Sequence, residues 1–283
     1  MLLSNIVIVD LTRYLPGPYC TRMLADLGAS VIKIEPLAGD PMQSVAWYDA
    51  LNRGKRVVRL DLKDEAQRAE LAATLKDADV VIEGFRPSTA KALGVDAAAI
   101  RSHHPRLIHC SITGYGQKGS DAERSGHDIN YQCEAGLLTE PPTPPSFLVA
   151  DLTGGLHATI QILAALVARG RTGEGASLDV SLFASAAAWA PFKVPEILSG
   201  AYACYNMYET ADGRWIALGA LEAKFWQRFC NQLARPQWIA LQFAEDPQRS
   251  MLLAEVREMI RSRSQSSWTQ TFSGVDCCFT PVR

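Results

Sequence analysis

The first half of the chain alternates short runs of β-branched residues with longer amphipathic or charged segments. This alternation is typical of βαβ units, in which crossover helices join parallel strands. It predicts an α/β fold with a mostly parallel sheet. The predicted strands are residues 6–11, 31–35, 57–60, 80–83 and 107–113, and the helices predicted between the last three are 64–75, 89–93 and 97–100.

The second half has a less regular pattern, and its character changes after about residue 205. We predict a large Rossmann-like domain over residues 1–190, a linker over 191–208 and a smaller α/β domain over 209–283. The further predicted helices are 128–138, 152–168, 184–189 and 224–233, and the further predicted strands are 147–150, 176–182 and 215–218.

Composition and charge narrow the classes of function. Hydrophobic residues make up 48% of the chain and charged residues 20%, as in globular proteins. A net charge of −2 gives no electrostatic reason to bind nucleic acid or an anionic membrane. The apolar start ends at Asp10 without a basic flank, and the apolar stretch 156–168 is too short to span a bilayer. We therefore predict a cytoplasmic protein with no nucleic-acid or membrane partner.

The seven cysteines are odd in number and include no CxxC pair. Their positions show no metal-like spacing against the five histidines. The pattern predicts reduced, mostly buried thiols and no metal site.

A dinucleotide-binding motif, G-x-G-x-x-G, occurs at Gly114, Gly116 and Gly119. The motif holds a pyrophosphate only where a helix with an apolar face begins directly after it. The following residues 120–125 have no apolar periodicity. We therefore expect no NAD binding.

Basic residues gather near the ends of predicted elements. Arg53 and Lys55 precede one strand, Arg86 follows another, and Lys33 and Lys91 lie at the ends of neighbouring elements. Because the ends of parallel strands meet along one edge of a sheet, such residues could bind the phosphates of a nucleotide-like ligand. For each residue alone, a solvated surface charge is the simpler interpretation.

A third group of residues could carry chemistry. His127 and Asp128 stand together before a predicted helix, Asp151 opens the next long helix, and Glu222 lies further on. The simplest role for the two aspartates is N-capping, and His127 could be an ordinary loop residue.

Several short blocks of the chain form a recognisable series. The opening residues Val-Asp-Leu-Thr-Arg at 9–13 and Pro-Gly-Pro at 16–18 are similar to the start of CoA-transferase family III. Agreement in the family's order over nearly the whole chain is not expected by chance. The further similar blocks are residues 24–29, 31–36, 51–56, 83–87, 111–116 and 171–175.

The resemblance implies a Rossmann-like large domain, a small α/β domain and an interlocked homodimer. It also implies an acyl-CoA thioester as substrate, no tightly bound cofactor and no metal. The residues that it implies for CoA binding are Arg13, Lys33, Arg53, Lys55, Phe85, Arg86, Lys91 and Tyr115.

The resemblance leaves two reactions open. The sequence Gly-His-Asp-Ile-Asn-Tyr at 126–131 is similar to the 2-methylacyl-CoA racemase branch, in which His127 and Asp151 would be acid and base and Glu222 would support them. In the transferase branch, Asp128 would be the nucleophile, with Gln132 four residues later. We favour the racemase.

Two departures from the family support a third possibility. The family runs several dozen residues further and returns to the large domain, whereas this sequence stops at Arg283, and the loop at 40–52 is compressed. A truncated, non-catalytic CoA-binding paralogue would share these features.

Overall fold

The computed structural model describes residues 1–138 and 141–283, which form two compact units, Met1–Phe192 and Lys193–Arg283. The predicted linker over 191–208 lies mostly within the second unit. There it forms a short 3₁₀ helix at Glu196–Leu198 and the beginning of a strand, β7 (Tyr205–Glu209).

A six-stranded sheet organises the first unit, and every neighbouring pair of its strands is parallel. The order β3-β2-β1-β4-β5-β6 is that of doubly wound nucleotide-binding folds, and it reverses direction between β1 and β4. The α/β prediction is confirmed. The strands are β1 (Val7–Asp10), β2 (Ser30–Glu35), β3 (Arg56–Arg59), β4 (Val80–Glu83), β5 (Ile108–Thr113) and β6 (Ser177–Ser181).

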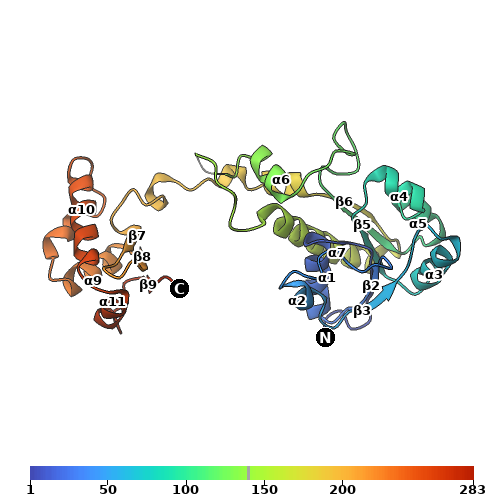
Figure 1. Cartoon of the computed structure of the whole chain (residues 1–283), viewed down its shortest axis with the longest axis horizontal. Coiled ribbons are helices and arrows are strands. Elements are labelled where there is room, and N and C mark those ends of the chain that lie inside the picture. Colours follow the sequence, from blue (N-terminus) through green and yellow to red (C-terminus); the bar gives the residue numbers. More distant parts are fainter. Residues whose placement is uncertain (139–140) are drawn as a thin grey trace. The chain divides into compact units, whose positions relative to one another are not determined.

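Helices cover both faces of this sheet (Figure 1). The strands are apolar on both faces, because successive residues of a strand point to opposite sides of the sheet. In β1, Ile8 packs in one core and Val9 in another, and both are fully buried. The first core includes α1 (Pro16–Asp26) and α7 (Val149–Thr172). The second core includes α3 (Glu65–Leu75), α4 (Pro87–Leu93) and α5 (Ala97–His103).

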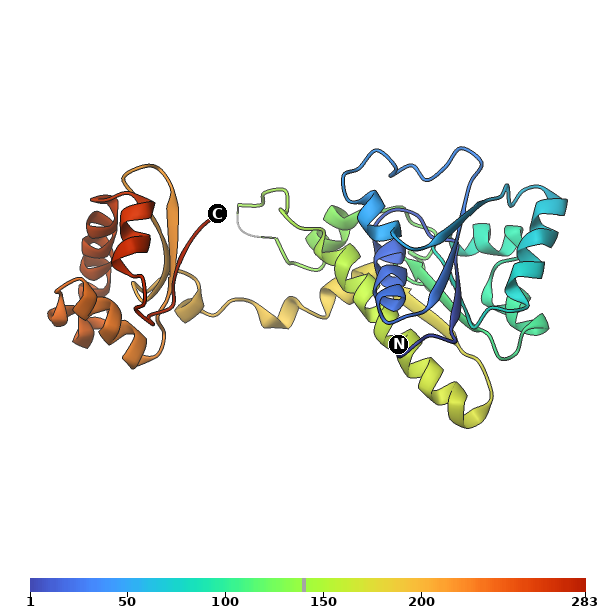
Figure 2. The same cartoon turned by 90° about the horizontal axis from the view of Figure 1, so that it is seen from below.

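The helix α7 differs most from its prediction. The strand predicted at 147–150 is wrong, because the helix already begins at Val149 and continues to Thr172. Among the described residues, α7 is long and apolar enough to cross a membrane. The prediction that this apolar stretch is too short to span a bilayer is therefore wrong. Its burial shows that α7 is a core helix, because Ala158 and Ile162 are fully buried in the core of the first unit. The helix runs beside α1, as Figure 2 shows.

The glycine motif lies in a loop after β5 that does not lead directly into a helix. The next helix, α6 (Asp128–Glu134), begins nine residues after Gly119 in the sequence. The geometry that holds a dinucleotide pyrophosphate on a helix N-terminus is therefore not formed at this motif.

The second unit has its own sheet and core. Its strands β7, β8 (Trp215–Gly219) and β9 (Phe279–Pro281) pair antiparallel, and neither β7 nor β9 was expected as a strand. Its core contains Trp226, Trp238 and Trp268, each at most 2% exposed. The helices are α9 (Ala223–Gln232), α10 (Gln248–Arg261) and α11 (Gln265–Thr271).

Candidate active site

A cleft of about 810 Å³ opens in the first unit at the carboxyl ends of its strands. Ligands of doubly wound sheets bind at this edge, where the strand order reverses, because the loops after β1 and β4 diverge there. The lining residues come from the loops after β1 to β5 and from the starts of α6 and α7. They include Thr12, Arg13, Tyr14, Leu37, Asp61, Lys63, Phe85, Arg86, Thr113, Gly126, His127 and Asp151.

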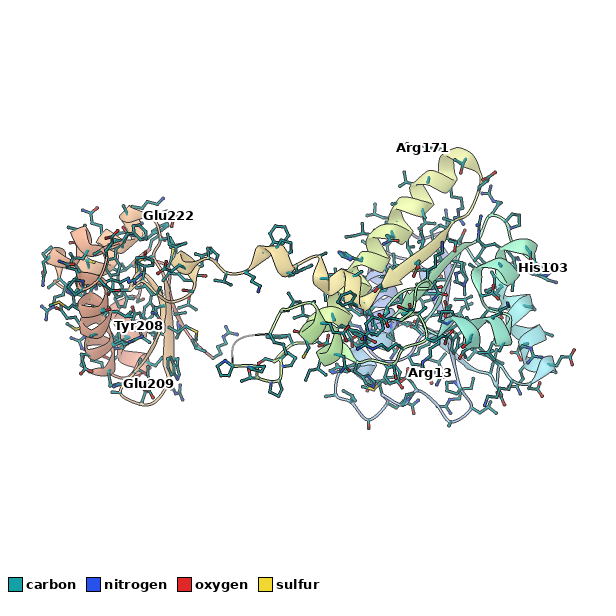
Figure 3. The ribbon with its side chains drawn as sticks, turned by 90° about the horizontal axis from the view of Figure 1, so that it is seen from above. Arg13, His103, Arg171, Tyr208, Glu209 and Glu222 are labelled. Carbon is teal, nitrogen blue, oxygen red and sulfur yellow. The ribbon has the colours of Figure 1, made fainter. Side chains whose placement is uncertain are left out.

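Basic side chains line the cleft from separate loops. Arg13 follows β1, Lys63 follows β3 and Arg86 is the N-cap residue of α4. The guanidinium carbon of Arg13 lies 6.0 Å from the ring centroid of Phe85. Figure 3 labels Arg13, and Arg171 at the end of α7 lies well away from it. The predicted residues Arg13, Phe85 and Arg86 are thus brought together, in a setting suited to phosphate groups.

Lys33 and Lys55 lie inside the unit and do not line the cleft. The Lys33 ammonium is buried, 2.7 Å from Asp40 and 3.6 Å from Glu35. Lys55 is also buried and donates to the hydroxyl of Thr21 at 2.7 Å. Carboxylates lie beside both ammonium groups, those of Asp40 and Glu35 beside Lys33 and that of Asp10 beside Lys55. The assignment of the two lysines to CoA binding stays a prediction.

Arg53 and Lys91 are exposed but do not line the cleft. Arg53 ends α2 (Tyr48–Asn52), and its carbonyl accepts a hydrogen bond from Arg22 at 3.2 Å. Lys91 lies in the last turn of α4. Their assignment to CoA binding stays a prediction.

Tyr115 also lies outside the cleft, but it contacts a cleft residue that the sequence analysis passed over. Its hydroxyl donates to Glu134 at 2.9 Å, and the guanidinium carbon of Arg124 lies 4.7 Å from its ring centroid. Arg124 lines the cleft and pairs with Glu134 at 2.5 Å. No periodicity in the polar loop 120–125 could have indicated this position.

A buried network fixes the loop after β1. The Asp10 carboxylate accepts hydrogen bonds from the Thr12 N–H at 2.9 Å and the Thr21 hydroxyl at 2.6 Å. It also accepts a hydrogen bond from the Thr12 hydroxyl, and the Lys55 ammonium lies 3.5 Å away. Burial lowers the pKa of Lys55, and the charge of Asp10 opposes this shift. The network therefore anchors the segment that carries Arg13 into the cleft.

His127 lines the cleft at the N-terminus of α6. It is the N-cap residue of that helix, and its N–H donates to the side-chain oxygen of Asn130 at 3.0 Å. The residue is exposed. Its imidazole lines the cleft, where it can reach a bound ligand.

Asp128 is the first residue of α6 and does not cap its own helix. It is only 4% exposed, and it does not line the cleft. One carboxylate oxygen accepts from the Asp151 N–H at 3.0 Å, and the other accepts from the Gln132 amide at 2.5 Å. Asp128 thus supports the first turn of α7 from a separate helix.

Asp151 is the third residue of α7, whose N-cap residue is Leu148. The predicted N-cap role of Asp151 is therefore wrong, and its side chain lines the cleft with His127. Burial, together with the charge of Asp128, raises the pKa of Asp151 to about 7. A carboxyl group with this pKa can give or take a proton at neutral pH.

Glu222 lies in the second unit, as the exposed N-cap residue of α9 (Figure 3). The cleft described above is formed by the first unit alone. The supporting role of Glu222 stays a prediction.

Glu83 is a further acidic residue behind the cleft. It ends β4 and is fully buried, and its carboxylate accepts from the Phe85 N–H at 2.7 Å. Burial raises the pKa of Glu83 to about 7. Through its hydrogen bond with the Phe85 N–H, Glu83 stabilises the turn that places Phe85 and Arg86 in the wall of the cleft.

The sequence model of CoA-transferase family III matches residues 3–283, nearly the whole chain. The chain belongs to CoA-transferase family III. The alpha-methylacyl-CoA racemase of Homo sapiens is 33% identical over 315 residues, covering 100% of this chain and 78% of that protein. The succinate–glutarate CoA-transferase of Agrobacterium fabrum is 35% identical over 265 residues, covering 82% of this chain and 66% of that protein.

The fold agrees with this family III membership. The crystal structure of a CAIB/BAIF family protein from Brucella suis matches with a TM-score of 0.87 at 28% identity, over 99% of this chain and 83% of that one. Family III enzymes act on CoA thioesters without a tightly bound cofactor. This chain is an enzyme of the family, an acyl-CoA racemase or a CoA-transferase.

Proposed function

We propose that this family III enzyme is a 2-methylacyl-CoA racemase, which moves the proton on the carbon next to the thioester. The observation that carries the proposal is the different placement of the three acid–base residues. His127 and Asp151 line one cleft, whereas Asp128 is buried with both oxygens engaged in hydrogen bonds. The 33% identity to the human racemase supports the same reaction.

The reaction needs a base on one side of the α-carbon and an acid on the other. In one direction His127 takes the α-proton, and Asp151 delivers a proton to the opposite side of the carbon. In the other direction the two residues exchange roles. A group transfers protons best when its pKa lies near the working pH, and the pKa of about 7 for Asp151 meets this condition.

The CoA part of the substrate would be held by the basic side chains of the cleft. Its phosphates carry several negative charges, which match Arg13, Lys63, Arg86 and Arg124. The Phe85 ring beside Arg13 offers an apolar surface next to these charges. Binding at this end leaves the thioester to reach His127 and Asp151.

Transfer of CoA is the second candidate, and the CoA-transferase relative of Agrobacterium fabrum supports it. In this reaction the Asp128 carboxylate attacks the thioester carbonyl, the CoA thiolate leaves and a mixed anhydride forms. The thiolate then attacks the aspartyl carbonyl and releases the first acid, and an acceptor carboxylate later takes over the CoA. Asp128 would first have to give up its hydrogen bonds to Asp151 and Gln132.

The substitution Asp128→Asn separates the two reactions. Asparagine keeps an acceptor oxygen for the Asp151 N–H but removes the negative charge that raises the pKa of Asp151. We expect proton exchange at the α-carbon to persist within about tenfold of wild type, because no nucleophile is lost. In the direction in which Asp151 is the acid, wild-type activity falls as the pH rises through about 7, and in the variant this fall occurs at lower pH.

The same variant can contradict the racemase proposal. If Asp128 is the nucleophile, its loss would reduce turnover by about 10³-fold or more. Intact-protein mass spectrometry of the wild type with acyl-CoA would then show an acyl or CoA adduct that the variant lacks. We expect no adduct.

We also propose that the enzyme is a homodimer. The first unit exposes apolar side chains at Ile160 and Val167 of α7 and, further along the chain, at Phe192, whose exposed fractions are 61%, 60% and 83%. Such side chains are commonly covered in an assembly. Sedimentation velocity at assay concentrations should give twice the mass of the chain, and the mass of a single chain would contradict the proposal.

A further inference from the structure

Tyr14 has an unusual backbone conformation within the cleft wall. Its φ angle is 65°, in the left-handed region that bulky residues rarely adopt. Its side chain is nevertheless 49% exposed and lines the cleft. A strained residue of this kind persists only where its surroundings fix it, and such residues gather at functional sites.

Both flanks of Tyr14 are fixed by contacts inside the first unit. On one side, Thr12 is held by the buried carboxylate of Asp10. On the other side, Pro16 lies against α7 so closely that a methyl group on Gly155 would come within 2.7 Å of the Pro16 carbonyl oxygen. The chain between these points has little freedom, which explains why the strain at Tyr14 is retained.

The strained conformation places the aromatic ring beside the proposed base. The ring centroids of Tyr14 and His127 lie 6.2 Å apart with an interplanar angle of 82°, an edge-to-face contact. Asp151 and Leu182 line the same cleft. The ring therefore occupies space where the acyl group of a bound thioester must lie if its α-carbon is to reach His127.

We infer that Tyr14 is a specificity-determining residue, whose ring forms a wall of the acyl subsite and limits the size of the group on the α-carbon. This inference rests on the proposed racemase function. Compact 2-methylacyl groups fit beside the ring, whereas a bulky substituent on the α-carbon meets it. The left-handed backbone is retained because it directs the ring into the cleft.

The test compares wild type with Tyr14→Gly and Tyr14→Phe on 2-methylbutanoyl-CoA and 2-phenylpropanoyl-CoA. Glycine removes the ring and adopts the left-handed conformation without strain, so the melting temperature should not fall. In Tyr14→Gly we expect the ratio of kcat/KM values to shift about tenfold or more towards the phenyl substrate. Tyr14→Phe keeps the ring and should keep the wild-type ratio, and free CoA should bind all three proteins equally.

Each contrary result has a distinct meaning. A ratio that stays within about twofold in folded Tyr14→Gly, with the wild type active, would overturn the role of Tyr14 alone. A shift in Tyr14→Phe as large as that in Tyr14→Gly would assign the effect to the hydroxyl and overturn the role of the ring. If the wild type exchanges no α-proton on either substrate, the proposed function fails first, and this inference fails with it.

Discussion

Replacing His127 by alanine is expected to lower the rate of α-proton exchange on a 2-methylacyl-CoA by about 10²–10⁴-fold, the contribution of a well-placed acid or base. The loss should appear in kcat, because the imidazole acts on the reacting carbon and the basic cleft residues still bind the CoA part. His127 is exposed, so its removal leaves no buried cavity, and the melting temperature should fall only slightly. Stopped reactions analysed by chiral chromatography provide the rates.

His103→Ala is the matched control for this substitution. His103 is an exposed histidine in the last turn of α5, and it does not line the cleft (Figure 3). We expect its loss to leave the exchange rate within about twofold of wild type. Retention of activity in His127→Ala would refute the assignment of the base.

Replacing Asp10 by alanine is expected to cost about 3–5 kcal/mol of the free energy of unfolding, the usual loss when one partner of a buried ion pair is removed. The substitution leaves the Lys55 ammonium without its counter-charge and removes the nearest acceptor of the Thr21 hydroxyl. Urea unfolding followed by circular dichroism measures the loss. Because the same carboxylate anchors the loop of Arg13, the KM for acyl-CoA should rise as well.

Asp10→Asn is the control for this account. The amide keeps one acceptor oxygen, which serves Thr12 or Thr21 but not both, and it has no charge for Lys55. We expect a smaller loss than for alanine, since Lys55 already has a lowered pKa and can lose its proton. Equal stability of Asp10→Ala and wild type would show that the network does not anchor the loop.

The sheet of the first unit could be predicted from the sequence because its strands are short runs of buried β-branched residues. The run at 80–83 was located with its bounds correct, since every one of its residues is buried between helices. The start of α7 could not be located in this way, because the apolar residues around Val149 fit a strand as well as a helix. Only packing against α1 and the sheet distinguishes the two.

The position of the candidate site could also be predicted from the sequence, but the set of residues that line it could not. Loops after parallel strands meet at one edge, so Arg86 could be expected there, whereas Arg13 was indicated only by the family resemblance. Burial of a lysine cannot be inferred from strand position alone, and Lys33 is neutralised by Asp40, which is seven residues away in the chain. The strained Tyr14 gave no signal either, because the left-handed conformation is usually marked by glycine.

The central claim is that His127 and Asp151 exchange the α-proton of an acyl-CoA. We would incubate the purified enzyme with one stereoisomer of 2-methylbutanoyl-CoA in heavy water and follow the α-proton by NMR. The account predicts that the α-proton signal disappears while the opposite stereoisomer accumulates. An unchanged signal, from protein shown to be folded and to bind CoA, would contradict it.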